Sequence, residues 1–276
     1  MIKTALKKLC SVLGLSLLLS ANPVTANASP NDSLKDIYDM RVLTFAILSD
    51  YYMFSGLEGD SRYNREIESN IKQFEHKLSQ ITDATSPTAK LSSLANAITE
   101  WQKYKDLLDI NRADFLTQGY ANARLVSDLS DNAISLSDSL NIVYKVLIDE
   151  NKIQLNDFTK YTREMGLIIQ TVTAEYAARS TSSLGQVNVI NINEGGMDNQ
   201  GKVFSDLLAK LKDGASERRI YKLVDQVGVK WEFIAKSIAN YNKNAVPFIV
   251  SSYGDRISKD LAIIEERYVK SLQAKK

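Results

Sequence analysis

The chain has 276 residues, with 34 Lys and Arg against 33 Asp and Glu, one His and one Cys. This balance excludes the strongly basic surface of a nucleic-acid-binding protein, and so few His and Cys argue against a zinc site or a His-dependent catalytic triad. Four Pro and 12 Gly over this length favour long helices.

The first 28 residues have the organisation of a secretory signal peptide. Lys3, Lys7 and Lys8 precede an apolar run over 9–21, and a small-x-small motif at 26–28 stands before Ser29. The apolar run is shorter than the roughly 20 residues that span a bilayer. We therefore expect cleavage before Ser29, export to the periplasm, and membrane association only if the segment is retained. Cleavage would leave 31 basic residues against 33 acidic ones and no cysteine.

Turn signals divide the first half of the remaining chain into four predicted helices. The breaks are the Gly-containing stretch 56–60, the Pro-containing stretch 82–87 and a weak point at 111–114. Asp32 or Ser33 is predicted to cap the first helix, and Asp60 the second. In the second half, Pro247 stands where the last weak point would recur and should end or kink a helix.

Apolar landmarks recur about 130 residues apart, around the only two Trp residues of the chain. The recurring positions are Lys72, Phe74, Leu78, Leu94, Ala97, Trp101, Tyr104 and Leu108, matched by Lys202, Phe204, Leu208, Val224, Val227, Trp231, Ile234 and Ile238. Further towards the N-terminus, Met40, Asp50 and Tyr51 match Met165, Glu175 and Tyr176 at a separation of 125 residues. The spacing of three and four is that of one buried helix face.

These observations predict an all-α protein made of two tandem up-and-down four-helix bundles, over 30–148 and 149–276. The alternative is one long four-helix bundle, in which the breaks at 56–60 and near 111 are only kinks. The alternating segment 187–192 is flanked by Gly and Asn, so we expect a loop there instead of a strand.

The first helix carries the candidate binding residues. Its segment 40–54 has only two charged residues, Arg41 and Asp50, so it should be buried on most sides. Arg41 shares a face with Thr44 and Tyr51, and a buried guanidinium needs a partner. Asp50 lies on the opposite face, so the partner should be an acid of another helix, water at a bundle end, or an external anion. Gly166 stands at the matching position of the second half, so the fold itself does not require a cation there.

The sequence lacks the residues that most enzymatic mechanisms require. His76 stands among charged neighbours and is expected to be solvated, and no phosphate-binding or dinucleotide-binding glycine motif is present. Glu265 and Glu266 are adjacent on a helix and are interpreted as part of a solvated face. Glu175 and Arg179 are four residues apart, which predicts an ion pair on a helix surface. We expect no enzyme activity, no metal and no cofactor.

The stretch 38–56 resembles the start of PilJ-type sensory domains, the extracytoplasmic helical modules of type IV pilus chemotaxis transducers, which are related to nitrate-sensor input domains. Residues 41–44 (Arg-Val-Leu-Thr) resemble the family's Arg-Met-Leu-Ser core, and 54–56 (Phe-Ser-Gly) its helix break. The family's Gly-Arg-Gln lead is replaced by 37–39 (Ile-Tyr-Asp), and its second Arg by Ala46. The resemblance therefore implies a ligand-binding role only for Arg41 and Thr44.

Together these features predict a non-enzymatic periplasmic protein that resembles a sensory input domain. It would hold a small ligand or an envelope or pilus protein through Arg41, Thr44 and Tyr51, with no nucleic-acid partner. The alternative is a structural or assembly accessory factor of a pilus or secretion system.

Overall fold

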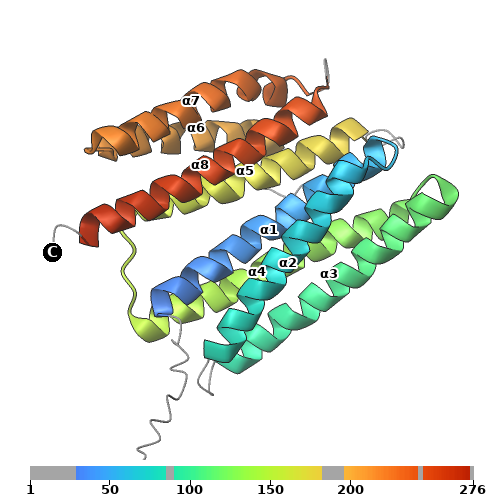
Figure 1. Cartoon of the computed structure of the whole chain (residues 1–276), viewed down its shortest axis with the longest axis horizontal. Helices are drawn as coiled ribbons and strands as arrows, with labels where there is room; N and C mark the ends of the chain where they lie inside the picture. The colour runs from blue at the N-terminus through green and yellow to red at the C-terminus, as the bar shows by residue number, and fades with distance from the viewer. Residues whose placement is uncertain (1–28, 85–89, 182–195, 242–244, 274–276) are drawn as a thin grey trace, which may run out of the picture.

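The computed structural model describes residues 29–84, 90–181, 196–241 and 245–273, and this part of the chain forms eight α-helices without a strand. The prediction of an all-α protein is confirmed. The predicted signal peptide, Pro87 and the loop at 187–192 lie outside the described residues, whereas 82–84 of the predicted turn at 82–87 are helical. The helices are α1 (Pro30–Gly56), α2 (Ser61–Ala84), α3 (Lys90–Gln118), α4 (Ala123–Asn151), α5 (Asp157–Thr181), α6 (Gly196–Gly214), α7 (Arg218–Ala239) and α8 (Pro247–Gln273) (Figure 1).

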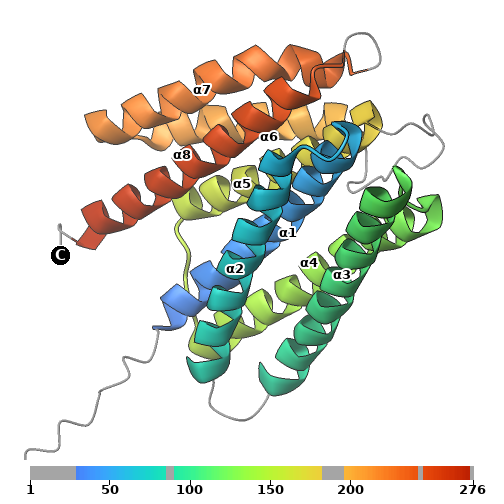
Figure 2. The same cartoon turned by 45° about the vertical axis from the view of Figure 1, so that its right-hand side comes forward.

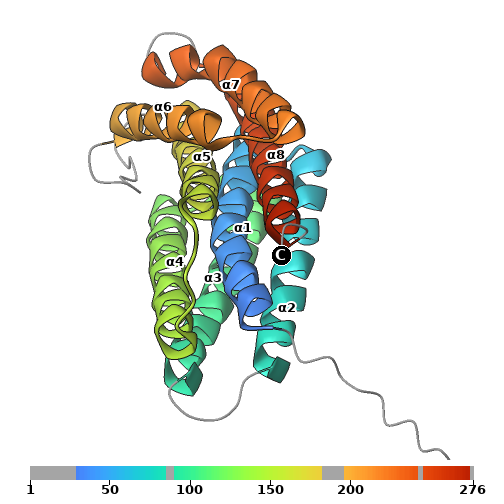
Figure 3. The same cartoon turned by 90° about the vertical axis from the view of Figure 1, so that its left-hand side faces the viewer.

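Helices α1 and α5 lie side by side at the centre and run in the same direction (Figures 1 and 2). Gly166, in the first half of α5, faces Tyr38 of α1, and Gly56 at the end of α1 faces Thr181 at the end of α5. Helices α2 and α4 pack on α1, and α3 packs on α4. Helices α6 and α8 pack on α5, with α7 against both (Figure 3).

The buried apolar side chains form two clusters. One cluster is formed by the four helices α1, α2, α3 and α4 together with three Ala of α5. The other cluster is formed by α5, α6, α7 and α8. Trp101 and Trp231 are 3% and 4% exposed, one in each cluster. Their rings lie against Phe74 and Phe204, with centroids 3.7 and 4.3 Å apart. The predicted burial of both Trp side chains is therefore confirmed, with one aromatic pair between α2 and α3 and the other between α6 and α7.

The first helix is buried on most sides, as its composition predicts, because α2, α4 and α5 all pack on it. Its N-cap differs from the prediction. The Ser29 hydroxyl accepts from the Asp32 backbone N–H, and the Asp32 carboxylate accepts from the Ser29 backbone in return. This reciprocal capping box starts the helix at Pro30, before either of the two predicted caps.

The turn at 57–60 is a real chain reversal. Glu58 and Gly59 have φ of 55° and 83°, and Asp60 accepts from the Arg62 backbone N–H at 2.8 Å, so its predicted capping role is confirmed. Helices α1 and α2 then pack on each other. The alternative of a continuous kinked helix is wrong at this point.

The predicted weak point at 111–114 is also wrong. Helix α3 continues to Gln118 because the buried Asn111 amide donates to the carbonyl oxygens of Leu107 and Leu125, at 2.8 and 2.9 Å. The break comes at Gly119, which has φ of 79°, and Asn122 caps α4. Helix α4 extends past the predicted module boundary to Asn151, and the link to α5 covers 152–156.

Candidate functional site

A pocket of about 660 Å³ opens where α1, α4 and α5 meet the link 152–156. Its wall combines cationic, aromatic and aliphatic side chains from segments that are far apart in sequence. The lining residues are Tyr38, Arg41, Tyr144, Ile148, Ile153, Gln154, Leu155, Lys160, Arg163, Glu164 and Leu167. We call this site the α1/α4/α5 pocket. It contains Arg41, the residue for which the sequence makes the strongest case.

Arg41 is held by neutral oxygens of α4. Its Nη1 donates to the Asn141 Oδ1 at 2.9 Å, and its Nε donates to the Ser137 Oγ at 3.4 Å. Among the described residues, no carboxylate lies within ion-pair distance. Desolvation lowers the pKa of Arg41, although the charge of Asp138 acts in the opposite direction. The guanidinium is thus a partly buried cation without a bonded anion.

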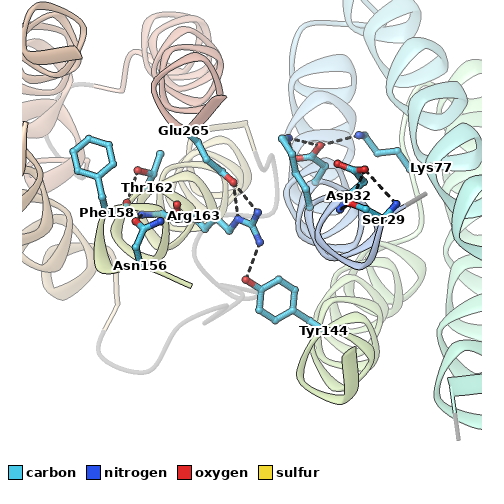
Figure 4. Close-up of polar contacts among 12 residues, drawn as sticks. Ser29, Asp32, Lys77, Tyr144, Asn156, Phe158, Thr162, Arg163 and Glu265 are labelled. Carbon is cyan, nitrogen blue, oxygen red and sulfur yellow. Dashed lines mark hydrogen bonds and ion pairs between the residues drawn. The ribbon is translucent and has the colours of Figure 1, made fainter. Parts of the chain in front are cut away.

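The guanidinium of Arg163 on α5, in contrast, has an acidic partner. Its Nε and Nη2 donate to the Glu265 Oε1 at 2.9 and 2.7 Å, and its Nη1 donates to the Tyr144 hydroxyl at 3.0 Å (Figure 4). Desolvation acts to lower the pKa of Arg163, but the hydrogen bonds and charge of Glu265 outweigh it and raise the pKa. Glu265 is 2% exposed, so the interpretation of a solvated Glu265–Glu266 face is wrong for Glu265.

Tyr38 completes the contact between α1 and α5. Burial first, and then the charges of Glu265 and Asp39, raise the pKa of its hydroxyl well above the ordinary value, so the group stays neutral. The hydroxyl lies against Gly166, where any side chain would meet it. Glycine at 166 thus leaves room for the Tyr38 hydroxyl, and a larger side chain there would have to displace it.

The rest of the wall is mostly aliphatic, with the polar Gln154 and two charged residues, Lys160 and Glu164. Ile148, Ile153, Leu155 and Leu167 form the apolar part. At the rim, the Lys160 Nζ pairs with the Asp157 Oδ1 at 3.0 Å in an exposed position. Such a pocket can hold an anion with an apolar body. Its lining offers neither His nor Cys as a base or nucleophile, and no His, Cys, Asp and Glu group in the described ranges has the arrangement of a metal site.

The structure does not bring the three predicted binding residues together. Thr44 lies in the core, where its hydroxyl donates to the Met40 carbonyl at 2.9 Å and its own carbonyl accepts from the Tyr104 hydroxyl at 3.0 Å. Tyr51 is buried further along α1 and lines a second pocket of about 890 Å³. Arg41 and Tyr51 are ten residues apart, about 15 Å along a helix. Only Arg41 lines the α1/α4/α5 pocket.

The Glu175–Arg179 pair is buried, so its prediction as a surface pair is wrong. The Glu175 side chain is fully buried and Arg179 is 15% exposed, with 2.7 Å between the Glu175 Oε1 and the Arg179 Nη2. Burial raises the pKa of Glu175, while Arg179 acts to lower it. Arg179 also donates to the Tyr241 hydroxyl at 2.7 Å, which ties α5 to the end of α7. This pair stabilises a helix junction away from the pocket.

Asp50 is a buried acid between α1 and α2. Its Oδ2 accepts from the Asn70 amide at 2.9 Å. Burial raises its pKa well above the ordinary 3.8, and Asp255 and Glu66 raise it further, while Asn70 and Lys259 act to lower it. The group is 4% exposed and does not line the α1/α4/α5 pocket. We therefore treat Asp50 as a determinant of stability.

Comparison of the chain with protein-family models, curated proteins and solved structures finds no match. Within the described ranges, no helix has the length and apolar character needed to cross a membrane. His76 is exposed, as the sequence predicts.

The sequence reasoning missed Arg163, Tyr144 and Tyr38. A signal for Arg163 was present, because the alignment of Met40 with Met165 places it at the position that matches Tyr38.

Proposed function

We propose that this protein is a non-enzymatic periplasmic binding protein that holds a small anionic ligand in the α1/α4/α5 pocket. One observation carries the proposal: the Arg41 guanidinium lines the pocket, is partly buried, and has only neutral hydrogen-bond partners. Export rests on the predicted signal peptide. The pocket volume lies in the range of roughly 300–1,000 Å³ that is typical of small-molecule sites.

The energetic argument concerns desolvation. Withdrawing a cation from water is unfavourable unless charged or hydrogen-bonding groups compensate for it. Ser137 and Asn141 supply neutral compensation only. A bound anion would add a charge-assisted hydrogen bond, which is roughly twice as strong as a neutral one.

We further propose that the chain consists of two related four-helix modules, and that its likeness to PilJ-type sensory domains reflects a shared binding role. The aromatic pairs Phe74–Trp101 and Phe204–Trp231 support the duplication, because each joins the second and third helix of its half. The contact of α1 with α4 likewise has its counterpart in the contact of α5 with α8.

Isothermal titration calorimetry with a panel of inorganic and carboxylate anions tests the proposed function. We expect saturable binding that Arg41→Ala weakens by at least tenfold and that Arg65→Ala leaves unchanged. Arg65 is a suitable control because it is exposed on α2, where its Nη1 donates to the Ser61 hydroxyl, and it does not line the α1/α4/α5 pocket. An unchanged circular dichroism spectrum of Arg41→Ala would show that the fold is intact. If Arg41→Ala binds the anions as tightly as Arg65→Ala does, or if the wild type binds none of them, the proposal is contradicted.

The second candidate function, an assembly accessory factor, is favoured by the outer face of α7, where Val229 and Phe233 are 63% and 57% exposed. Exposed apolar residues grouped on one helix face are typical of protein contacts. A photo-crosslinker at Val229 should then capture one envelope protein in the periplasm, and a crosslinker at the exposed Lys160 should not. Capture by neither residue would contradict this function.

A further inference from the structure

We infer that the anion is a monocarboxylate that carries an apolar body, such as a medium-length aliphatic acid. This inference rests on the proposed function of the α1/α4/α5 pocket and specifies its ligand. Three independent features support it: the charge balance of the lining, the hydrogen-bond donors that remain free, and the composition of the wall.

The charge balance favours a single negative charge. Among the cations that line the pocket, Arg163 is matched by Glu265 and Lys160 by Asp157, at 2.7 and 3.0 Å. Arg41 is left as the only lining cation of the described chain without a carboxylate partner. Glu164 adds a negative charge to the wall. A second negative charge on the ligand would therefore find no lining cation of the described chain that lacks a carboxylate partner.

The remaining donors match a flat anion with two oxygens. A guanidinium has five N–H donors, and Arg41 uses one on Nε and one on Nη1. No described residue accepts from the second Nη1 hydrogen or from the two Nη2 hydrogens. The paired Nη groups form the end-on fork that binds a carboxylate through two parallel bonds. The Tyr144 hydroxyl accepts from Arg163, so its own hydrogen is available to donate to the same ligand.

The wall supplies contacts for an apolar body. Ile148, Ile153, Leu155 and Leu167 line one continuous pocket with Arg41. A bare inorganic anion would leave most of the 660 Å³ unfilled and these side chains without contact. An aliphatic chain attached to the carboxylate would bury apolar surface against them, and each buried methylene strengthens binding by roughly fourfold.

Calorimetry with five probes tests the inference: acetate, hexanoate, adipate, hexan-1-ol and phosphate. Hexanoate should bind at least tenfold more tightly than acetate, adipate or phosphate, and hexan-1-ol should not bind measurably. Leu155→Ser should weaken hexanoate at least fivefold and leave acetate unchanged. Leu116→Ser is the matched control, because Leu116 is 69% exposed outside this pocket. Arg41→Ala should abolish hexanoate binding.

The outcomes separate the two proposals. If phosphate or acetate binds as tightly as hexanoate in an Arg41-dependent manner, the anion-binding function stands and the monocarboxylate inference is wrong. Equal binding of hexan-1-ol and hexanoate also overturns the inference, because the carboxylate then contributes nothing. If no probe binds, or if Arg41→Ala binds every probe like the wild type, both proposals fail.

Discussion

The buried ion pair between α5 and α8 leads to a sharp prediction about stability. Glu265→Leu should lower the free energy of unfolding by about 3–5 kcal/mol, because it leaves the Arg163 cation buried without its anion. The side chains of Arg163 and Glu265 are only 10% and 3% exposed, and two N–H groups of Arg163 converge on one Glu265 oxygen. Water therefore screens both partners only weakly.

A double-mutant cycle separates the loss of the pair from the loss of packing. Arg163→Met restores an apolar partner for Leu at 265, so the double variant should recover most of the loss and lie within about 1–2 kcal/mol of the wild type. Urea unfolding followed by far-UV circular dichroism and Trp fluorescence measures each free energy. Trp231 lies in the same apolar cluster as the ends of α5 and α8, so its emission reports on this half.

The control is an ion pair in solvent. Lys212 and Asp225 are 2.7 Å apart with side chains 43% and 51% exposed, so Asp225→Ala should leave the unfolding midpoint unchanged. If Glu265→Leu lowers stability by less than about 1 kcal/mol, like a surface pair, the burial argument is refuted. A double variant as unstable as the sum of the two single variants would equally refute it, because the charges would then not be coupled.

Further stability predictions concern side chains outside the pair, each measured by urea unfolding. Asp50→Asn should stabilise the protein at neutral pH. Because the pKa of Asp50 is raised on folding from 3.8, wild-type stability falls as pH rises through the folded pKa, so this gain should disappear in acid. Trp101→Ala and Trp231→Ala should each lower stability by about 3–5 kcal/mol. If the fluorescence quantum yield of each Trp is the same in the native protein as in the unfolded protein, the burial of these side chains is contradicted. Gly166→Ala should lower it by about 1–3 kcal/mol through the clash with Tyr38, and a more stable variant would contradict this contact.

The helices and their buried faces were predictable because they depend on local periodicity. Trp101 and Trp231 recur with apolar neighbours three and four residues away, and this spacing alone identifies the face that packs inward. Helix ends were less predictable. At Asn111, a side-chain amide that bonds to α4 keeps α3 intact where the local sequence favours a break.

Buried charges were missed because their burial is decided by a distant partner. Glu265 appears solvated when only its neighbour Glu266 is considered, but Arg163, 102 residues away in sequence, lies opposite to it. A local signal existed, since Glu265 is four residues after Leu261 and eight after Ile257, on the buried face of α8. Periodicity therefore locates such a residue at the core, and only the tertiary structure shows what neutralises it.

The same reasoning explains why the sequence predicted Arg41 but not the other polar residues of the candidate pocket. In a chain of two related halves, as we propose, matching positions of α1 and α5 have different surroundings, because the two helices pack on each other side by side and in the same direction. Tyr38 and Arg163 match in sequence, as do Arg41 and Gly166. Tyr38, Arg41 and Arg163 line the pocket, and Gly166 faces Tyr38. Gly166 accommodates the Tyr38 hydroxyl, which leaves Arg41 without a counterpart. The cation without a bound anion thus lies beside a position at which the two halves differ, whereas the Trp–Phe pairs of α2 with α3 and of α6 with α7 stay alike.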